Sequence, residues 1–125
     1  MNSQLATLLI HGFGANKDHW RHNKAVLGSI SECYAIDLIG FGESSQPNSC
    51  IQRERKSPDN FCYNFDNWGQ QIADFTRLVI KKPVILIGNS IGGIIALRAA
   101  KILGPKCKGI ILINCAQRLM DDKQL

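Results

Sequence analysis

Four short apolar runs divide the chain, each bounded by glycine or polar residues: Ala6 to Ile10, Cys33 to Leu38, Val84 to Ile87 and Gly109 to Ile113. Near-continuous apolar runs of this length are typical of strands buried on both faces of a parallel sheet. Helix-like stretches lie between the runs, and strands that alternate with helices indicate right-handed crossovers. The pattern predicts an α/β fold built on four parallel strands.

Three segments predict about three helices, which would cover the two faces of the sheet. Residues Asp66 to Ile80 carry apolar side chains at helical spacing, namely Trp68, Ile72, Phe75 and Val79. This spacing predicts an amphipathic helix. The segment that follows Ser90 is apolar on nearly all sides until Gly104, which predicts the most buried helix. A weaker helical pattern covers Asp18 to Leu27.

The polar segment from Gln46 to Tyr63 contains Pro47 and Pro58 and shows no periodicity, so residues 46–63 are predicted to be a surface excursion. With 125 residues, 45% of them apolar, the chain can bury one core but not two. We expect residues 1–125 to form a single domain.

Charge and cysteine content narrow the classes of partner and compartment. The net charge of +5 is scattered without interleaved aromatic residues, which favours a solvated surface over a nucleic-acid-binding one. No apolar run approaches the roughly 18 residues of a membrane span, and no signal peptide precedes the first strand. The five cysteines are odd in number and lack C-x-x-C spacing, which predicts free thiols in a reducing compartment: Cys33, Cys50, Cys62, Cys107 and Cys115.

The strongest chemical pattern is a G-x-S-x-G motif between a predicted strand and a predicted helix, Gly88-Asn89-Ser90-Ile91-Gly92. A serine at such a turn is lifted clear of the sheet as a nucleophile, and Gly88 and Gly92 are required because a Cβ would collide across the turn. The alternative is that Ser90 is an ordinary helix N-cap. The context predicts a nucleophile elbow with Ser90 as the catalytic residue.

A second motif, His11-Gly12-Phe13-Gly14, directly follows the first strand. Parallel strands end at the same edge of a sheet, so this loop and the elbow open onto one crevice if their strands are neighbours. The backbone N–H groups of Phe13 and Ile91 could then donate to one oxyanion, and losing one such donor costs roughly 3 kcal/mol. We expect Gly12 and Gly14 to shape the loop and His11 to be a structural hydrogen-bonding residue in it.

These motifs, together with Tyr34 to Ser44 and Trp68, resemble the α/β-hydrolases over residues 5–116. The sequence looks similar to the pheophytinase-like serine hydrolases, and Gly88-Asn89-Ser90 resembles the meta-cleavage-product carbon-carbon hydrolases. Haloalkane dehalogenases and soluble epoxide hydrolases share the framework but use an aspartate nucleophile, so Ser90 argues against both. The resemblance also makes a plastid-like compartment an alternative to the cytoplasm.

The resemblance implies a partial fold, with the four strands matching the third to sixth of the family's eight. Their spatial order would be second run, first run, third run, fourth run, which leaves the two outer strands as unprotected edges. The family's catalytic histidine, and an acid after its sixth or seventh strand, would fall beyond Leu125. None of the three histidines (His11, His19 and His22) follows a late strand, so none is expected to be the catalytic base. Asp121 and Asp122 follow the fourth strand, but neither is assigned as the catalytic acid.

The expected function is hydrolysis of carboxylic esters through an acyl-enzyme on Ser90, with a small apolar ester or ketone as substrate. Carbon-carbon bond hydrolysis is the second alternative, and a truncated fragment that is inactive alone is the third. A dinucleotide-binding module would use Gly12-x-Gly14 and Asp37, but Lys17 replaces its third glycine.

No cofactor or metal is expected, because His19-x-x-His22 lacks a third ligand. Asp37, Gly40, Gly42 and Ser44 are expected to shape a tight loop beside the site. Trp20 and Trp68 are expected in the core. Oligomeric state is not predicted.

Overall fold

The structure is a computed structural model that describes residues 4–50 and 60–115. Its centre is a four-stranded, fully parallel sheet with the order β2 (Glu32–Ile36), β1 (Ala6–Ile10), β5 (Val84–Asn89) and β6 (Cys107–Ile113). This order confirms the predicted arrangement of the second, first, third and fourth apolar runs. The second strand ends before Asp37 and Leu38, which belong to the following loop.

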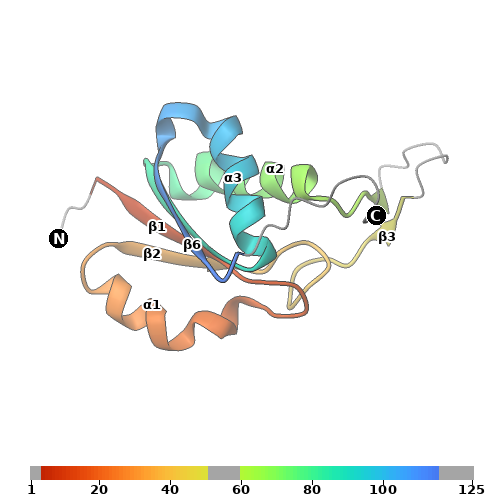
Figure 1. Cartoon of the computed structure of the whole chain (residues 1–125), viewed down its shortest axis with the longest axis horizontal. Coiled ribbons are helices and arrows are strands. Elements are labelled where there is room, and N and C mark those ends of the chain that lie inside the picture. Colours follow the sequence, from red (N-terminus) through yellow and green to blue (C-terminus); the bar gives the residue numbers. More distant parts are fainter. Residues whose placement is uncertain (1–3, 51–59, 116–125) are drawn as a thin grey trace.

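Helices cover both faces of the sheet, as Figure 1 shows. A 3₁₀ turn, η1 (Lys17–Trp20), and α1 (Arg21–Gly28) lie on one face, while α2 (Phe65–Phe75) and α3 (Ile91–Leu103) lie on the other. A second 3₁₀ turn, η3 (Gly104–Lys106), joins α3 to β6. The three helices therefore lie where the alternating pattern placed them.

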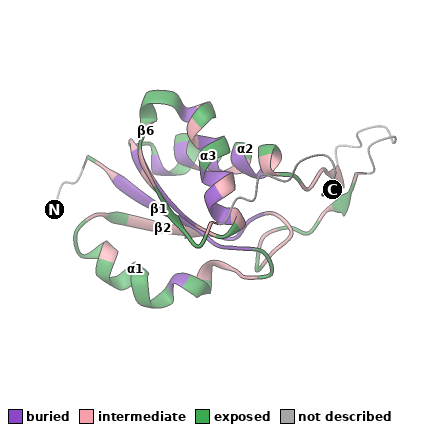
Figure 2. Ribbon diagram, in the orientation of Figure 1, coloured by how far each residue is buried: buried purple, intermediate pink, exposed green. Residues whose placement is uncertain are grey.

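The hydrophobic core is concentrated between the sheet and the α2–α3 pair. Helix α3 buries six residues along its length, as expected for the most apolar helix, whereas α1 buries none (Figure 2). Beneath α1 a small second cluster contains Leu9, Trp20 and Ile87. Trp20 and Trp68 are both core residues, as expected, although Trp68 also lines a surface hollow described below.

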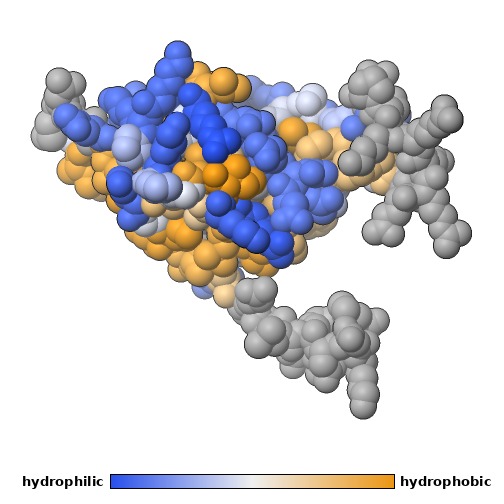
Figure 3. Space-filling model, turned by 90° about the horizontal axis from the view of Figure 1, so that it is seen from above, coloured by the Kyte–Doolittle hydropathy of each residue, from blue (hydrophilic) through white to orange (hydrophobic). Residues whose placement is uncertain are grey.

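The expectation that all four strands are buried on both faces is wrong for the two outer ones. Strand β1 is buried at every position, but β2 has no buried residue and the last three residues of β6 are exposed. In Figure 3 apolar side chains gather along one margin of the molecule. Strands β2 and β6 are less buried than β1 because each pairs with one neighbour in the described sheet.

The predicted helix from Asp66 to Ile80 changes its pitch after Phe75. Residues Thr76–Ile80 form a π-helical turn, η2, which takes one more residue per turn than an α-helix. Because of this extra residue Ile80 faces the core and Val79, predicted on the apolar stripe, is 54% exposed. Thr76 is buried, and its hydroxyl donates to the carbonyl of Ile72 at 2.9 Å.

The described ends of the 46–63 excursion form a short parallel pair, β3 (Asn48–Ser49) with β4 (Asn60–Phe61). Next to this pair Cys50 and Cys62 form a disulfide, with their Cα atoms 5.0 Å apart. The prediction of five free thiols is therefore wrong for these two residues, because the pairing of β3 with β4 brings cysteines 12 positions apart side by side. The other three cysteines are free, as predicted: Cys33, Cys107 and Cys115.

Among the described residues, no helix combines the length and apolar character that crossing a membrane requires.

Candidate active site

Ser90 lies at the sharp turn between β5 and α3, with φ of 56° and ψ of −123°. Non-glycine residues rarely adopt a positive φ, and such strain is typical of functional sites. Ser90 occupies the N-cap position, but its side chain makes no capping hydrogen bond, so the geometry does not support the ordinary N-cap interpretation. Its N–H donates to the carbonyl of Ile113 at 2.9 Å, which ties the elbow to β6.

The elbow leaves no room for side chains at its two flanking glycines. A Cβ on Gly88 would overlap the carbonyl group of Gly92, and a Cβ on Gly92 would overlap the carbonyl oxygen of Ile10. Helix α3 can therefore start directly against the ends of β5 and β1. A side chain at either glycine would therefore have to displace backbone atoms.

The loop that follows β1 lies against the elbow, because β1 and β5 are paired with Ile10 opposite Gly88. A Cβ on Gly12 would be 3.2 Å from the Cβ of Ser90 and 3.2 Å from the carbonyl oxygen of Asn89. The loop turns tightly, with the N–H of Ala15 donating to the carbonyl of Gly12 and Gly14 at a φ of 74°. Within the described residues, no hydrogen bond occupies the N–H of Phe13 or of Ile91.

His11 is fully buried, and both of its ring nitrogens are engaged. Nδ1 lies 2.7 Å from the carbonyl oxygen of Gly12, and Nε2 accepts from the N–H of Leu38 at 3.0 Å. Burial lowers the pKa of His11, and the contact with Gly12 offsets only part of this effect. The ring thus cross-links the two loops, and its lowered pKa favours the neutral form.

Asp37 is the anchor of the loop that follows β2. Its buried carboxylate accepts from the N–H of Lys17 at 2.6 Å, the N–H of Glu43 at 2.9 Å and the Lys17 ammonium at 3.1 Å. Burial opposes the charged form, but these donors together hold the pKa of Asp37 below its ordinary value. The carboxylate is thus occupied within its own loop, which argues against the ribose-binding role in the dinucleotide alternative.

Gln71 is a site-supporting residue that the sequence did not single out. From α2 its amide accepts from the N–H of Ile39 at 3.0 Å and donates to the carbonyl of Asp37 at 3.2 Å. The hydroxyl of Ser44 donates to the same carbonyl at 2.6 Å. A glutamine on an amphipathic helix is ordinarily expected to face solvent, so the sequence pattern does not mark Gln71 as a residue that supports the site.

Two hollows open beside the elbow. The larger, about 400 Å³, is mainly apolar and is lined by Phe13, Tyr63, Asn64, Phe65, Trp68 and Ile91. The smaller is lined by Ser90, Ile91, Ile94, Asn114 and Cys115. The thiol of Cys115 lies 3.2 Å from the carbonyl oxygen of Ser90. Neither Cys115 nor the aromatic wall was predicted; the position of Cys115 directly after the fourth strand was the available clue.

The remaining polar candidates lie outside this arrangement. His19 and His22 belong to η1 and α1, on the face of the sheet opposite α3. No cluster of three metal-ligating side chains occurs in residues 4–50 and 60–115. Asp121 and Asp122 lie outside the described residues.

The fold and this constellation agree with the comparisons to known proteins. The sequence profile of the alpha/beta hydrolase fold matches residues 7–124. The chain belongs to this family of enzymes, and several of its relatives are hydrolases.

Particular relatives include the chloroplastic pheophytinase of Arabidopsis thaliana, 30% identical over 87% of this chain and 26% of that protein. The human (lyso)-N-acylphosphatidylethanolamine lipase is 26% identical over 90% of the chain and 31% of its own length. The rat 1-acylglycerol-3-phosphate O-acyltransferase is 31% identical over 77% of the chain and 25% of that protein. The chain thus spans about a quarter to a third of the length of these relatives.

Solved structures give the same fold. A thermophilic esterase from Thermogutta terrifontis superposes with a TM-score of 0.75 at 24% identity, over 95% of this chain and 40% of that one. A membrane phospholipase A described as a bacterial virulence factor superposes with a TM-score of 0.72 at 33% identity, over 93% and 34% of the two chains. The described sheet therefore corresponds to part of the fold of these two proteins.

Proposed function

We propose that the protein is a serine hydrolase that cleaves carboxylic esters through an acyl-enzyme on Ser90. The observation that carries this proposal is the backbone of Ser90, which has a φ of 56° and no capping bond, at the point where the HGFG loop meets the elbow. A serine with a positive φ, no capping bond and a glycine two residues away on each side matches the backbone geometry of a nucleophile elbow. A serine that acts only as a helix N-cap does not need this backbone conformation.

In this mechanism Ser90 Oγ attacks the ester carbonyl carbon and its proton passes to a base. The carbonyl oxygen becomes an oxyanion that accepts from the N–H groups of Phe13 and Ile91. Collapse of this intermediate breaks the ester C–O bond, the alcohol leaves with a proton, and water then hydrolyses the acyl-Ser90 ester. No cofactor is required for any of these steps.

The base has to come from outside the three histidines of this chain. His11 uses both nitrogens in its loop, so accepting the proton of Ser90 would require breaking a buried hydrogen bond. By resemblance to the family, a histidine after the eighth strand would be the base, oriented by an acid. The 125 residues supply the nucleophile and the oxyanion donors in this proposal.

The apolar hollow supports an apolar group on the substrate. Phe13 is 76% exposed beside it, and Tyr63, Phe65 and Trp68 form an aromatic wall. Ile91 lines both this hollow and the one at Ser90, so an ester carbon bound at the serine could extend its chain over Ile91 onto the aromatic side chains. An acyl or alkyl chain is the group that fits this lining.

A fluorophosphonate probe tests the nucleophile directly. Intact-mass analysis of the folded chain, with imidazole added as an external base, is expected to show one adduct, on Ser90. Ser90→Ala should abolish the adduct, while Ser49→Ala, which changes an exposed serine in β3, should keep it. An adduct that persists in Ser90→Ala, or a folded chain that is never labelled under these conditions, would contradict the proposal.

Carbon-carbon bond hydrolysis is the second candidate. Asn89, which gives the elbow its resemblance to the meta-cleavage-product hydrolases, packs its amide near Gly12. A Cβ on Gly12 would be 3.6 Å from the Asn89 amide nitrogen, so the Asn89 side chain faces the HGFG loop. Product analysis with a vinylogous diketone against a simple ester would separate the two reactions.

A further inference from the structure

Acidic residues are absent from one long stretch of the sequence. Between Asp74 and Asp121 there are eight lysine and arginine residues and no aspartate or glutamate. Four of these cations line one hollow at the end of the sheet where β5 and β6 begin: Arg77, Lys81, Lys82 and Lys106. We call these four residues the cationic end.

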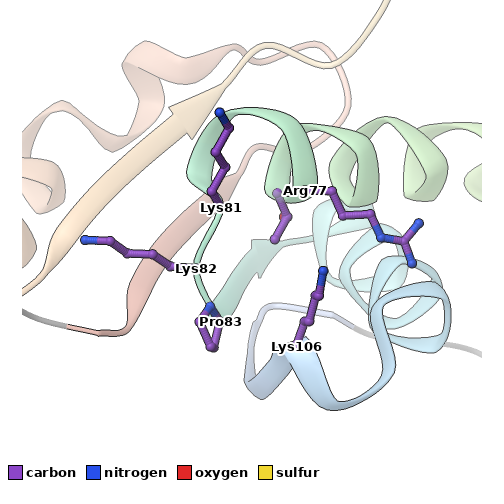
Figure 4. Close-up of a pocket in the computed structure, with 6 residues that line it drawn as sticks. Arg77, Lys81, Lys82, Pro83 and Lys106 are labelled. Atoms are coloured by element: carbon purple, nitrogen blue, oxygen red, sulfur yellow. The ribbon is translucent and has the colours of Figure 1, made fainter.

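Two neighbouring segments contribute the cationic end, as Figure 4 shows. Arg77, Lys81 and Lys82 leave from and directly after η2, and Lys106 approaches from η3. Two of the four have structural partners: Arg77 donates to the carbonyl of Ile102 at 3.0 Å, and Lys82 pairs with Glu32. In the described part of the chain, neither Lys81 nor Lys106 forms an ion pair.

Two exposed apolar side chains follow Arg77 on the same π-helical turn, although neither lines the hollow. Leu78 is 71% exposed and Val79 is 54% exposed, and both lie between Arg77 and Lys81. The π-helical turn that carries them is held by buried Thr76 and Ile80 on either side. The apolar pair is therefore presented to solvent by a turn anchored in the core.

We propose that the cationic end, with Leu78 and Val79, is a docking surface for a membrane that contains anionic lipids. Cations attract phosphate headgroups, and apolar side chains beside them insert at the boundary between headgroups and acyl chains. A soluble anion would use the cations but leave the exposed apolar pair without a role. The combination favours a lipid surface, and it is independent of the ester hydrolysis proposed above.

The docking surface and Ser90 lie at opposite ends of β5. Lys82 and Pro83 precede the strand, and Ser90 follows its six residues, so about 20 Å of sheet separates them. A protein docked in this way holds the elbow away from the lipid headgroups. Binding to vesicles is therefore expected to be unchanged in Ser90→Ala, which separates this proposal from the proposed function.

Co-sedimentation with vesicles tests the surface, with pure phosphatidylcholine compared against a mixture with phosphatidylglycerol. Each lysine near an anionic surface strengthens partitioning roughly fivefold, so Lys81→Gln/Lys106→Gln is expected to weaken it about 25-fold at low salt. Leu78→Gln/Val79→Gln is expected to weaken it about tenfold, also at high salt where the charge effect is screened.

Helix α1 offers a control outside the proposed surface, because Lys24→Gln/Val26→Gln removes one cation and one exposed apolar side chain, half of what the two test variants remove together. All substituted residues are exposed, so circular dichroism and thermal melts should match those of the unmodified chain. A control variant that loses binding as much as the test variants would overturn the proposal. Equal binding to both kinds of vesicle would also overturn it. Binding that depends on the cations but not on Leu78 and Val79 would overturn it too, because the apolar pair is the reason for preferring a lipid surface to a soluble anion.

Discussion

The two loops that meet at Ser90 are held by different interactions. The elbow depends on missing side chains, because Gly88 and Gly92 allow backbone to pack on backbone. The HGFG loop depends on polar side chains, because His11 and the Asp37–Lys17 pair bind it to the loop after β2. We infer that the elbow is sensitive to any added atom, whereas the HGFG loop is sensitive to protonation and to lost hydrogen bonds.

Gly88→Ala is expected to have the largest effect. Its Cβ would overlap the carbonyl group of Gly92, which is backbone and cannot move without shifting α3. We expect a loss of about 4 kcal/mol in the free energy of unfolding, at the upper end of overpacking effects. Urea denaturation measures it. Gly28→Ala, with nothing within 4 Å of the added Cβ, is the matched control and should be close to neutral.

Asp37→Asn is expected to come next, at about 2 kcal/mol, because the amide leaves buried donors of Lys17 and Glu43 incompletely satisfied. The lowered pKa means that the carboxylate stabilises the fold above its ordinary value of 3.8, and this contribution is lost as pH falls through the lower folded-state pKa. Stability measured from pH 6 to pH 3 should fall less steeply in Asp37→Asn. Identical slopes would show that the network does not bear on stability.

His11 should give the protein a second, milder acid sensitivity. Because its pKa is lowered in the folded state, the neutral ring stabilises the fold above 6.5, and stability is lost as pH falls below that value. The slope can reach about 1.4 kcal/mol per pH unit. Denaturation curves between pH 7.5 and pH 5 should lose this slope in His11→Gln and keep it in His19→Gln. A slope that follows His19 instead would contradict the cross-link.

Gly14→Ala is expected to have the smallest effect. Nothing lies within 4 Å of the added Cβ, so the cost comes only from the φ of 74°, roughly 1 kcal/mol. A melting temperature lowered by a few degrees, with labelling of Ser90 retained, would fit. An effect as large as that of Gly88→Ala would mean that the HGFG loop is as tightly packed as the elbow.

The contrast also explains what could be predicted from the sequence. The strands could be predicted because each is a local apolar run, and the elbow could be predicted because its glycines are close together in the chain. The interactions that hold the HGFG loop could not be predicted, because Lys17 and Asp37 are 20 positions apart and Gln71 binds the Asp37 carbonyl from 34 positions away. A single sequence carries no record of such contacts.

Two errors have related causes. The disulfide between Cys50 and Cys62 depends on the β3–β4 pair, whose two-residue strands leave no periodic trace. The exposure of Val79 depends on a π-helical turn that the apolar spacing of Asp66 to Ile80 does not reveal. In both cases a local hydrogen-bonding choice decided the structure, and the pattern of apolar and polar residues does not show that choice.

That π-helical turn also has a consequence for insertions and deletions. It accommodates one residue more than an α-helical turn while keeping Thr76 and Ile80 against the core. Deleting a single residue from it would convert the turn to an α-helical one and leave the strand that follows in register. Homologous chains one residue shorter here could therefore keep the same sheet, and would differ mainly in which side chains the turn presents to solvent.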